Sequence, residues 1–133
     1  ETVPAREKAL RRAKLSIMKI RRGCGSWECN CSEPHSIPFR VDGKCGSVKI
    51  KLMPAPKGKG LCVEKEVSKI LAFAGIKDVW SKTTGQTGTK TNLIKATVDA
   101  LQKLISTKVQ QNHIQDLNIV TGKINAPESK NEE

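Results

Sequence analysis

The fold class follows from residues 37–53, IPFRVDGKCGSVKIKLM. Residues 37–41 and 47–53 are predicted strands, because both runs are rich in β-branched and aromatic or aliphatic residues. Asp42-Gly43-Lys44 between them is the predicted hairpin turn, since an Asp-Gly pair accepts positive φ angles. Within residues 47–52 the apolar residues Val48, Ile50 and Leu52 alternate with lysines, which puts the two kinds on opposite sides of the strand. The stretch therefore predicts a sheet with one apolar and one basic face.

Two further helices and a third strand are predicted after the hairpin. Residues 64–74 form a helix that ends at Gly75, a common helix stop, and residues 76–82 form a strand. Residues 92–105 form the longest helix, and its broad apolar face comprises Leu93, Ala96, Thr97, Ala100, Leu101 and Leu104. With the helix that precedes the hairpin, this order predicts an α+β fold in which helices pack on a small mixed sheet.

The two ends of the chain differ in charge. Residues 4–17 are predicted to form an amphipathic helix with a basic outer face, and residues 1–22 hold eight Lys and Arg against two Glu. Residues 110–122 could hold either a short helix or a short strand. Residues 126–133 are polar and acidic, so we expect them to be disordered.

The net charge of +11 on 133 residues is the strongest compositional signal. A field of this sign on so small a domain predicts a polyanionic partner, most often nucleic acid. Aromatic residues are only 3% of the chain, so few base-stacking platforms are available and contacts with phosphates and with the shape of folded RNA are expected. No run approaches the roughly 20 apolar residues of a membrane span.

Four candidate metal ligands lie within twelve residues: Cys24, Cys29, Cys31 and His35. Three thiols and an imidazole can close a tetrahedral zinc site. Two alternatives stay open: free thiols, and redox or nucleophilic chemistry, for which His35 could be the base but no orienting group is recognisable. Trp27 is expected to cover this loop, and Cys45 and Cys62 to be packing thiols. The odd number of cysteines favours reduced thiols and a reducing compartment.

Two other segments are predicted to contact phosphates. Residues 54–60, PAPKGKG, begin with a rigid proline-containing half and end with a flexible glycine-containing half that carries two lysines. The glycines there let backbone amides approach an anion. Residues 83–92, TTGQTGTKTN, offer hydroxyls and amides that hydrogen-bond phosphate and ribose oxygens. An ordinary turn and a plain surface loop are the alternatives. The P-loop pattern is absent, so nucleotide hydrolysis has no support.

Several blocks in order resemble one family, the universal small-subunit ribosomal protein numbered five in the bacterial scheme. The blocks are RRG (21–23), GKCGSV (43–48), LMPAPKGKG (52–60), AGIKDV (74–79) and KATVDAL (95–101). The cysteine-rich loop before PHSIP (34–38) resembles the archaeal branch in particular.

The resemblance implies a domain layout. Residues 1–22 are the remnant of an N-terminal domain similar to double-stranded-RNA-binding modules, of which this chain is expected to lack the rest. Residues 23–37 are the metal loop and junction, residues 38–106 are a C-terminal domain with a left-handed β-α-β crossover, and residues 107–133 are a tail.

The resemblance also implies a function. The chain is expected to be a structural, non-enzymatic constituent of the small ribosomal subunit in the cytoplasm. It would bind small-subunit rRNA and the ribosomal proteins numbered four and eight, near the mRNA entry channel, and support decoding fidelity in translation. The expected rRNA contacts are Arg21, Arg22, Lys57, Gly58, Lys59, Gly60, Lys82, Gly85, Gln86, Thr87 and Lys90. The alternative is a free zinc-dependent nucleic-acid-binding or regulatory protein.

Overall fold

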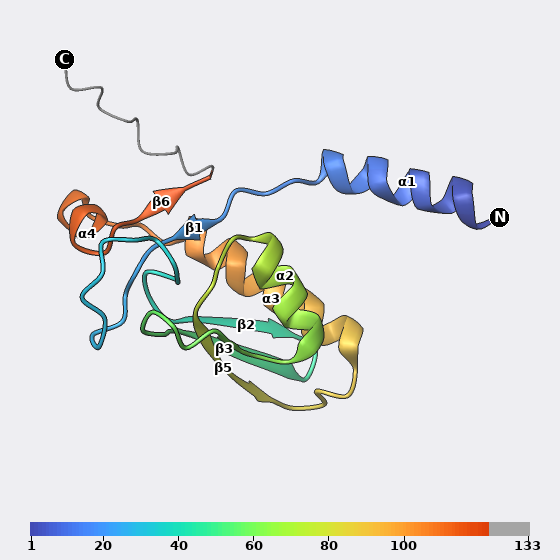
Figure 1. Cartoon of the computed structure of the whole chain (residues 1–133). Helices are drawn as coiled ribbons and strands as arrows, with labels where there is room; N and C mark the ends of the chain where they lie inside the picture. Colours follow the sequence, from blue (N-terminus) through green and yellow to red (C-terminus); the bar gives the residue numbers. More distant parts are fainter. Residues whose placement is uncertain (123–133) are drawn as a thin grey trace, which may run out of the picture.

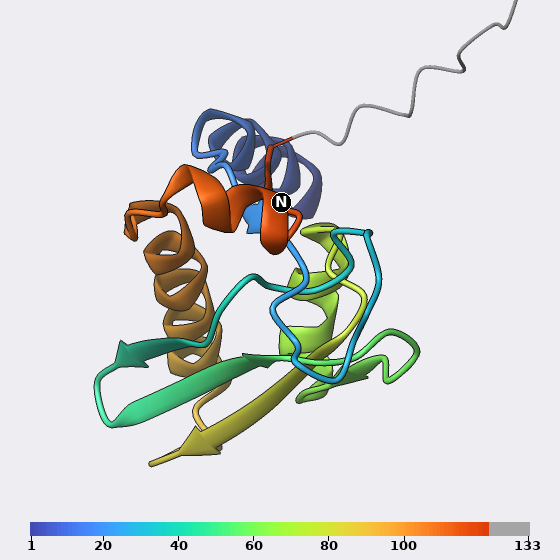
Figure 2. The same cartoon turned by 90° about the vertical axis from the view of Figure 1, so that its left-hand side faces the viewer.

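A four-stranded mixed sheet lies at the centre of the computed structural model, which describes residues 1–122. β3 pairs antiparallel with β2 and with β5, and β4 pairs parallel with β5. Helices α2 and α3 lie on one face of this sheet (Figures 1 and 2). The elements are β2 (Val41–Cys45), β3 (Val48–Pro54), β4 (Leu61–Cys62), α2 (Lys65–Phe73), β5 (Val79–Thr84) and α3 (Lys90–Ser106). The predicted α+β fold is confirmed.

The core lies between the sheet and helices α2 and α3. Val48, Ile50 and Leu52 of β3 are completely buried, as their alternation predicts. The predicted apolar face of the long helix is also confirmed, since all six of its residues are buried in α3. This helix begins at Lys90, two residues before the predicted start. Burial of these aliphatic side chains against one another supplies the main stabilisation of the domain.

The predicted hairpin turn is wrong. Asp42, Gly43 and Lys44 lie inside β2, and the chain turns at Gly46 and Ser47 instead. Gly43 faces α3 so closely that a Cβ atom there would collide with the carbonyl oxygen of Ala96. The glycine that indicated a turn is therefore needed for close packing of a helix on a strand. Of the predicted strand 37–41, only the last residue is in β2, and Ile37 is buried in an irregular segment.

The β4–α2–β5 segment is a β-α-β unit with parallel, adjacent strands. The two-residue strand β4 was not predicted, and β5 begins three residues after its predicted start, whereas the helix between them is confirmed. Gly75 follows α2 with φ of +78°, which confirms it as the helix stop. β5 continues to Thr84, so the first two residues of the predicted loop 83–92 belong to the sheet.

Helix α1 (Thr2–Leu15) projects away from the rest of the described chain (Figure 1). The helix itself is confirmed, although it ends two residues before the predicted Ile17. None of its residues is buried, and Val3 and Leu10 remain about half exposed. The predicted apolar face is therefore not covered by any described residue. No helix among residues 1–122 is both long enough and apolar enough to span a membrane.

A second, two-stranded sheet joins distant parts of the chain. β1 (Arg21–Arg22) pairs antiparallel with β6 (Val120–Thr121), and the short helix α4 (Gln111–Asp116) precedes β6. Both of the alternatives left open for residues 110–122 thus occur, one after the other. The expected disorder of residues 126–133 concerns a segment outside the described residues.

Candidate metal centre and nucleic-acid interface

The loop that carries the candidate ligands is held at both ends by backbone hydrogen bonds. Gly23 and Ser36 exchange N–H···O bonds in an antiparallel bridge, and the Cys24 N–H donates to the carbonyl of Leu117 at 2.8 Å. A Cβ atom on Gly25 would collide with the carbonyl oxygen of Pro38. Only glycine therefore fits where the start of the loop passes the segment that follows it. These contacts bring residues 24 and 35 close together.

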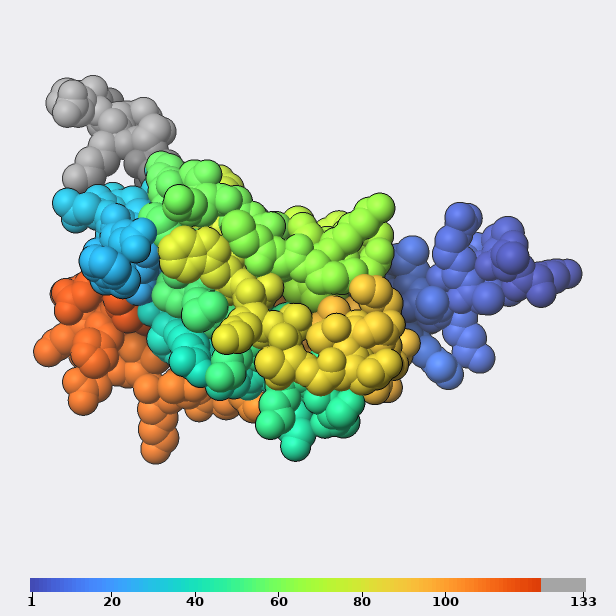
Figure 3. Space-filling model, turned by 90° about the horizontal axis from the view of Figure 1, so that it is seen from below, coloured from blue at the N-terminus to red at the C-terminus, as the bar shows by residue number. Residues whose placement is uncertain are grey.

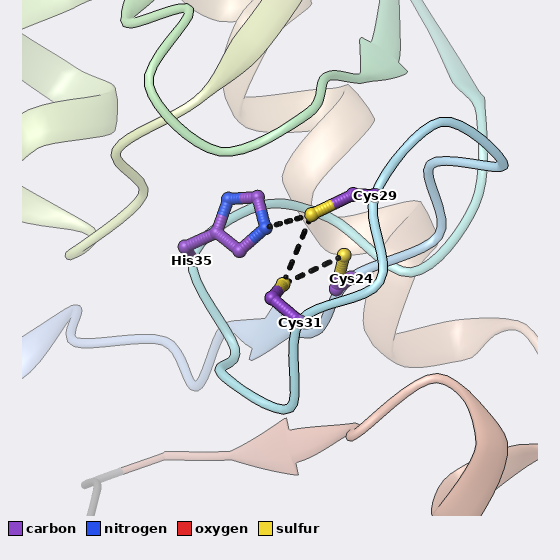
Figure 4. Close-up of side chains that lie close together, drawn as sticks. All are labelled: Cys24, Cys29, Cys31 and His35. Atoms are coloured by element: carbon purple, nitrogen blue, oxygen red, sulfur yellow. Dashed lines mark hydrogen bonds between the residues drawn. The ribbon is translucent and has the colours of Figure 1, made fainter.

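The four predicted ligands form one cluster. The sulfur atoms of Cys29 and Cys31 are 3.1 Å apart, those of Cys31 and Cys24 are 3.3 Å apart, and Cys29 Sγ lies 3.5 Å from His35 Nε2. All four donor atoms lie within 4.8 Å of one another and point to a common centre (Figure 4). Tetrahedral zinc with Zn–S bonds of about 2.3 Å separates its ligand atoms by about 3.7 Å. The number, kind and spacing of these donors therefore fit a structural zinc ion.

His35 is oriented by a carboxylate that was not predicted from the sequence. Its Nδ1 lies 2.7 Å from Asp78 Oδ2, and both residues are almost completely buried. A histidine that binds a metal through one ring nitrogen usually donates from the other to such a partner, which fixes the tautomer and the ring. Asp78 is 43 residues away in sequence, so no local pattern could have indicated this contact.

Two thiols of the cluster have shifted pKa values. Burial, followed by hydrogen bonds with Cys31 and Cys29, raises the pKa of Cys24 to about 12. A hydrogen bond with Cys31, followed by one from the Lys57 backbone N–H, lowers the pKa of Cys29 to about 6. The chain thus stabilises a thiolate at Cys29 even before a metal is considered, which is the form in which cysteine binds metals.

The other cysteines and Trp27 differ from expectation in part. Trp27 is 91% exposed, so the prediction that it covers the loop is wrong. Cys45 packs against the core as predicted, but Cys62 is exposed and the prediction of a packing thiol is wrong there. None of the five cysteines, all within the described residues, forms a disulfide.

The predicted contact residues Lys57, Gly58, Lys59 and Gly60 lie together in the segment between β3 and β4, which we call the connector. Both lysines are exposed, and both glycines have positive φ angles. The Lys57 ammonium lies 2.9 Å from Glu33 Oε2. The Gly60 N–H donates to Asp78 Oδ1 at 2.8 Å, so this amide is engaged within the chain. The lysine side chains, rather than the Gly60 amide, are therefore the groups here that face solvent.

Arg21 and Arg22 also make contacts within the chain. Arg21 donates to the carbonyl oxygen of Thr107 at 2.8 Å, just after α3 ends, and Arg22 donates to the carbonyl oxygen of Gly122 at 2.6 Å. Cations near a helix C-terminus stabilise it. A guanidinium has five donors, so these bonds leave others for a phosphate, and the predicted rRNA contact stays a prediction.

The remaining predicted contacts lie at the far end of β5. Gly85, Gln86 and Thr87 form the exposed or partly exposed turn between β5 and α3, and the Lys90 ammonium pairs with Glu64 Oε1 at 2.8 Å. Lys82 is exposed on β5. The structure thus separates the predicted contacts into the connector, this turn with Lys82, and the two arginines.

The sheet register reveals a row of lysines. Lys44 is directly opposite Lys49, and Lys51 is directly opposite Lys82, so all four lie on the helix-free face of the sheet. Figure 3 views the molecule from this side, where residues of β2, β3 and β5 (teal to yellow) reach the surface. Like charges directly opposite one another destabilise a sheet, and a bound polyanion would relieve the repulsion. Of these four lysines, only Lys82 was a predicted contact. The pairing of the others depends on the register of the strands, which the sequence does not give.

Trp80 lies on the same face, opposite Met53, and both are partly exposed. Asp42 lies opposite Lys51 and pairs with Arg40 at 3.3 Å, so one acidic group borders the row. The face is therefore basic overall, with an apolar pair at the end where β3 meets the connector. Such a surface suits the sugar-phosphate backbone of a nucleic acid.

Comparison with known proteins identifies the family. A sequence model described as "Ribosomal protein S5, C-terminal domain" matches residues 43–114, which is more than half of the chain. The chain belongs to this family. The resemblance seen in the sequence is thereby confirmed, and the matched residues of this S5 domain include the whole four-stranded sheet from Gly43 onward, α2, α3 and part of α4.

Curated relatives of this S5-family chain are archaeal proteins named small ribosomal subunit protein uS5. One from Nanoarchaeum equitans is 58% identical over 106 residues, covering 80% of this chain and 46% of that protein. One from Thermofilum pendens is 62% identical over 97 residues, covering 73% and 48%. One from Methanocaldococcus jannaschii is 48% identical over 124 residues, covering 93% and 57%. The chain spans about half the length of these relatives.

Proposed function

We propose that the chain is a structural, non-enzymatic part of the small ribosomal subunit that binds rRNA. Family membership supports the ribosomal role. The observation that carries RNA binding is the row of four lysines on the helix-free sheet face, which are paired with one another across the strands. Lysines in such an array neutralise phosphates and release counterions, so the proposed action is positioning of RNA.

The proposed RNA surface extends from this row to the predicted contacts. The connector at one end and the turn with Lys90 at the other border the same sheet. Arg21 and Arg22 are proposed as contacts through the guanidinium donors that they do not use within the chain. Neighbours proposed from the family are the ribosomal proteins numbered four and eight and the mRNA entry region, with a supporting role in decoding fidelity.

The proposed domain layout follows the family. Residues 1–22 would be the last helix of a double-stranded-RNA-binding-like domain, residues 23–37 the metal junction, residues 38–106 the C-terminal domain and residues 107–133 the tail. The location proposed for the protein is the small subunit in the cytoplasm.

We further propose that the cluster holds one structural zinc ion. Thiolates of Cys24, Cys29 and Cys31 and Nε2 of His35 would be the ligands, and the ion would close the loop covalently in place of an apolar core. The buried Asp78 carboxylate supports this assignment, because it fits the proton on the other ring nitrogen of His35.

The RNA proposal can be tested by salt dependence. The chain is titrated with deproteinised archaeal small-subunit rRNA between 50 and 200 mM KCl. We expect affinity to fall steeply with salt, and Lys51→Gln with Lys82→Gln to reduce the slope of log K against log salt by about 2. The control is Lys65→Gln with Lys69→Gln on α2, which removes the same charge on the helix side and should leave the slope nearly unchanged.

Two results would contradict the proposal. Equal effects of the two double variants would mean that the sheet face is not the contact surface. Absence of the native protein from purified small subunits would favour a free nucleic-acid-binding protein over a ribosomal one.

The zinc proposal is tested by elemental analysis of the purified chain. We expect one zinc per chain, and a stoichiometry near zero would contradict the zinc site.

A further inference from the structure

Two contacts join the metal loop and the connector, one directly and one through Asp78. The Lys57 ammonium pairs with Glu33 at 2.9 Å. The Gly60 N–H donates to Asp78 Oδ1 at 2.8 Å, and the second oxygen of this carboxylate lies 2.7 Å from His35 Nδ1. The connector is thus held at both ends by groups that belong to the metal loop or directly contact the ligand cluster.

Asp78 is the buried member of this set. It is 4% exposed, and its two carboxylate oxygens have different partners, one from the ligand cluster and one from the connector. Its own backbone is fixed as well, because its N–H donates to the His35 carbonyl and its carbonyl accepts from the Ser36 hydroxyl. The backbones of Asp78 and His35 are therefore fixed to each other, and rotation of the two side chains is the freedom that remains.

A metal at His35 Nε2 would hold the imidazole ring from the side opposite Asp78. The ring would then be fixed at both nitrogens, with Nδ1 donating to Asp78 Oδ2. Without a metal, Nε2 is not fixed in this way, and the ring is free to turn out of this position. Asp78 Oδ2 would then lose its partner, and rotation of the carboxylate would withdraw Oδ1 from the Gly60 N–H.

We propose that Asp78 couples the metal centre to the connector, so that zinc binding at His35 orders Gly60 and the lysines beside it. This inference rests on the proposed zinc site. In this proposal the metal would fix the shape of its own loop and also the position of the connector lysines that contact RNA. Asp78 is a positioning residue in this arrangement, since it acts on RNA only through the connector.

The test measures hydrogen exchange of the Gly60 amide by NMR in the full chain, with Zn²⁺ bound and after chelation. We expect exchange at Gly60 to be slower by roughly 10-fold or more with Zn²⁺, the scale of one hydrogen bond to a charged acceptor. The Asp78→Asn side chain has one oxygen and cannot accept from His35 and Gly60 through separate oxygens. Exchange at Gly60 should therefore no longer depend on zinc in this variant. Loss of such a partner of a ligand should also weaken Zn²⁺ binding by about 10- to 100-fold.

Asp99→Asn is the matched control. The Asp99 carboxylate also accepts a backbone N–H, that of Lys44 at 3.0 Å, but it lies on α3 beside β2. This variant should speed exchange at Lys44 and keep the zinc dependence at Gly60. Exchange at the buried Leu101 amide reports whether each variant is folded, and the comparison of the unmodified chain with and without Zn²⁺ needs no variant.

The outcomes separate the two proposals. Stoichiometric zinc with unchanged exchange at Gly60 overturns the coupling and leaves the metal site standing. A chain that binds no zinc overturns both. A zinc dependence at Gly60 that survives Asp78→Asn, in a variant that still binds Zn²⁺, also overturns the assignment to Asp78.

Discussion

The sheet-and-helix core and the cysteine-rich loop are stabilised in different ways. In the core, aliphatic residues such as Ile50 of β3 and Leu101 of α3 are completely buried against one another. In the loop, residues 24–35, most side chains are polar or exposed, and the closest contacts join sulfur and nitrogen atoms. One region depends on removal of apolar surface from water, whereas the other depends on a few donor atoms meeting at a point.

This difference predicts how each region responds to damage. A packed core loses stability in proportion to the apolar volume removed, because neighbouring side chains relax only partly. A loop closed by a metal keeps its shape until one ligand is lost, and then loses it altogether. Changes in one region should therefore leave the other largely intact.

The largest effect on stability is expected from Leu101→Ala. Leu101 is completely buried in α3, so the truncation should lower the free energy of unfolding by about 3 kcal/mol. Denaturant unfolding followed by circular dichroism measures this loss. Leu15→Ala is the control, because Leu15 is 84% exposed and the same truncation should change stability by less than about 0.5 kcal/mol. Equal losses would contradict the placement of the core.

Cys31→Ser should break the other region. Its sulfur lies within 3.3 Å of the sulfurs of both Cys24 and Cys29, so its loss should weaken Zn²⁺ binding by more than the about 100-fold expected for partners around a ligand. Competition with a chromophoric chelator measures the affinity. The helical circular dichroism signal should persist, since the core is independent of the loop. Cys62→Ser, at an exposed thiol, should leave zinc binding unchanged.

The core was largely predictable from local patterns. The six buried residues of α3 follow from helical spacing, and the inward residues of β3 follow from alternation. The hairpin turn failed because an Asp-Gly pair is a strong local signal, whereas Gly43 is needed for contact with Ala96 across 53 residues of sequence. Helix packing, which no local pattern contains, decided between the two roles.

The candidate sites were easier to predict where their residues lie close together in the sequence. The four metal ligands lie within twelve residues, and spacing alone indicated that they could meet. Asp78 and the row of lysines depend on strand register and on a contact between distant segments. Charge composition indicated a polyanion partner but could not show that Lys44 and Lys49 lie side by side.

Within the loop, the thiols should differ sharply in reactivity when the metal is removed. Cys29 has a pKa lowered to about 6, so about 90% of it is thiolate at pH 7, against a few per cent for an ordinary cysteine. We expect iodoacetamide to modify Cys29 about 2- to 3-fold faster than an ordinary thiol at this pH, because the lower basicity of the thiolate offsets most of the gain. Cys24, with its raised pKa, should react last. Peptide mass spectrometry over time measures the order, and zinc should protect both; faster reaction of Cys24 would contradict the pKa shifts.

The smallest effect concerns the ion pair that links the two regions at the surface. A hydrogen bond and the charge of Lys57 lower the pKa of Glu33. The pair therefore contributes above the ordinary pKa of glutamate, and its contribution is lost as the pH falls through the lowered value. Lys57→Gln should raise the Glu33 pKa toward its ordinary value, with little change in stability because both side chains are more than half exposed.

A carboxyl NMR titration can compare this pair with a second one in the core region. Lys90 lowers the pKa of Glu64 by the same kind of contact, at the N-terminus of α2. Lys90→Gln should therefore raise the Glu64 pKa and leave that of Glu33 unchanged, while Lys57→Gln should do the reverse. A shift of both carboxyls in either variant would mean that the general positive field of the chain, rather than each adjacent lysine, lowers these pKa values. The contact between loop and connector would then be weaker than its 2.9 Å distance indicates.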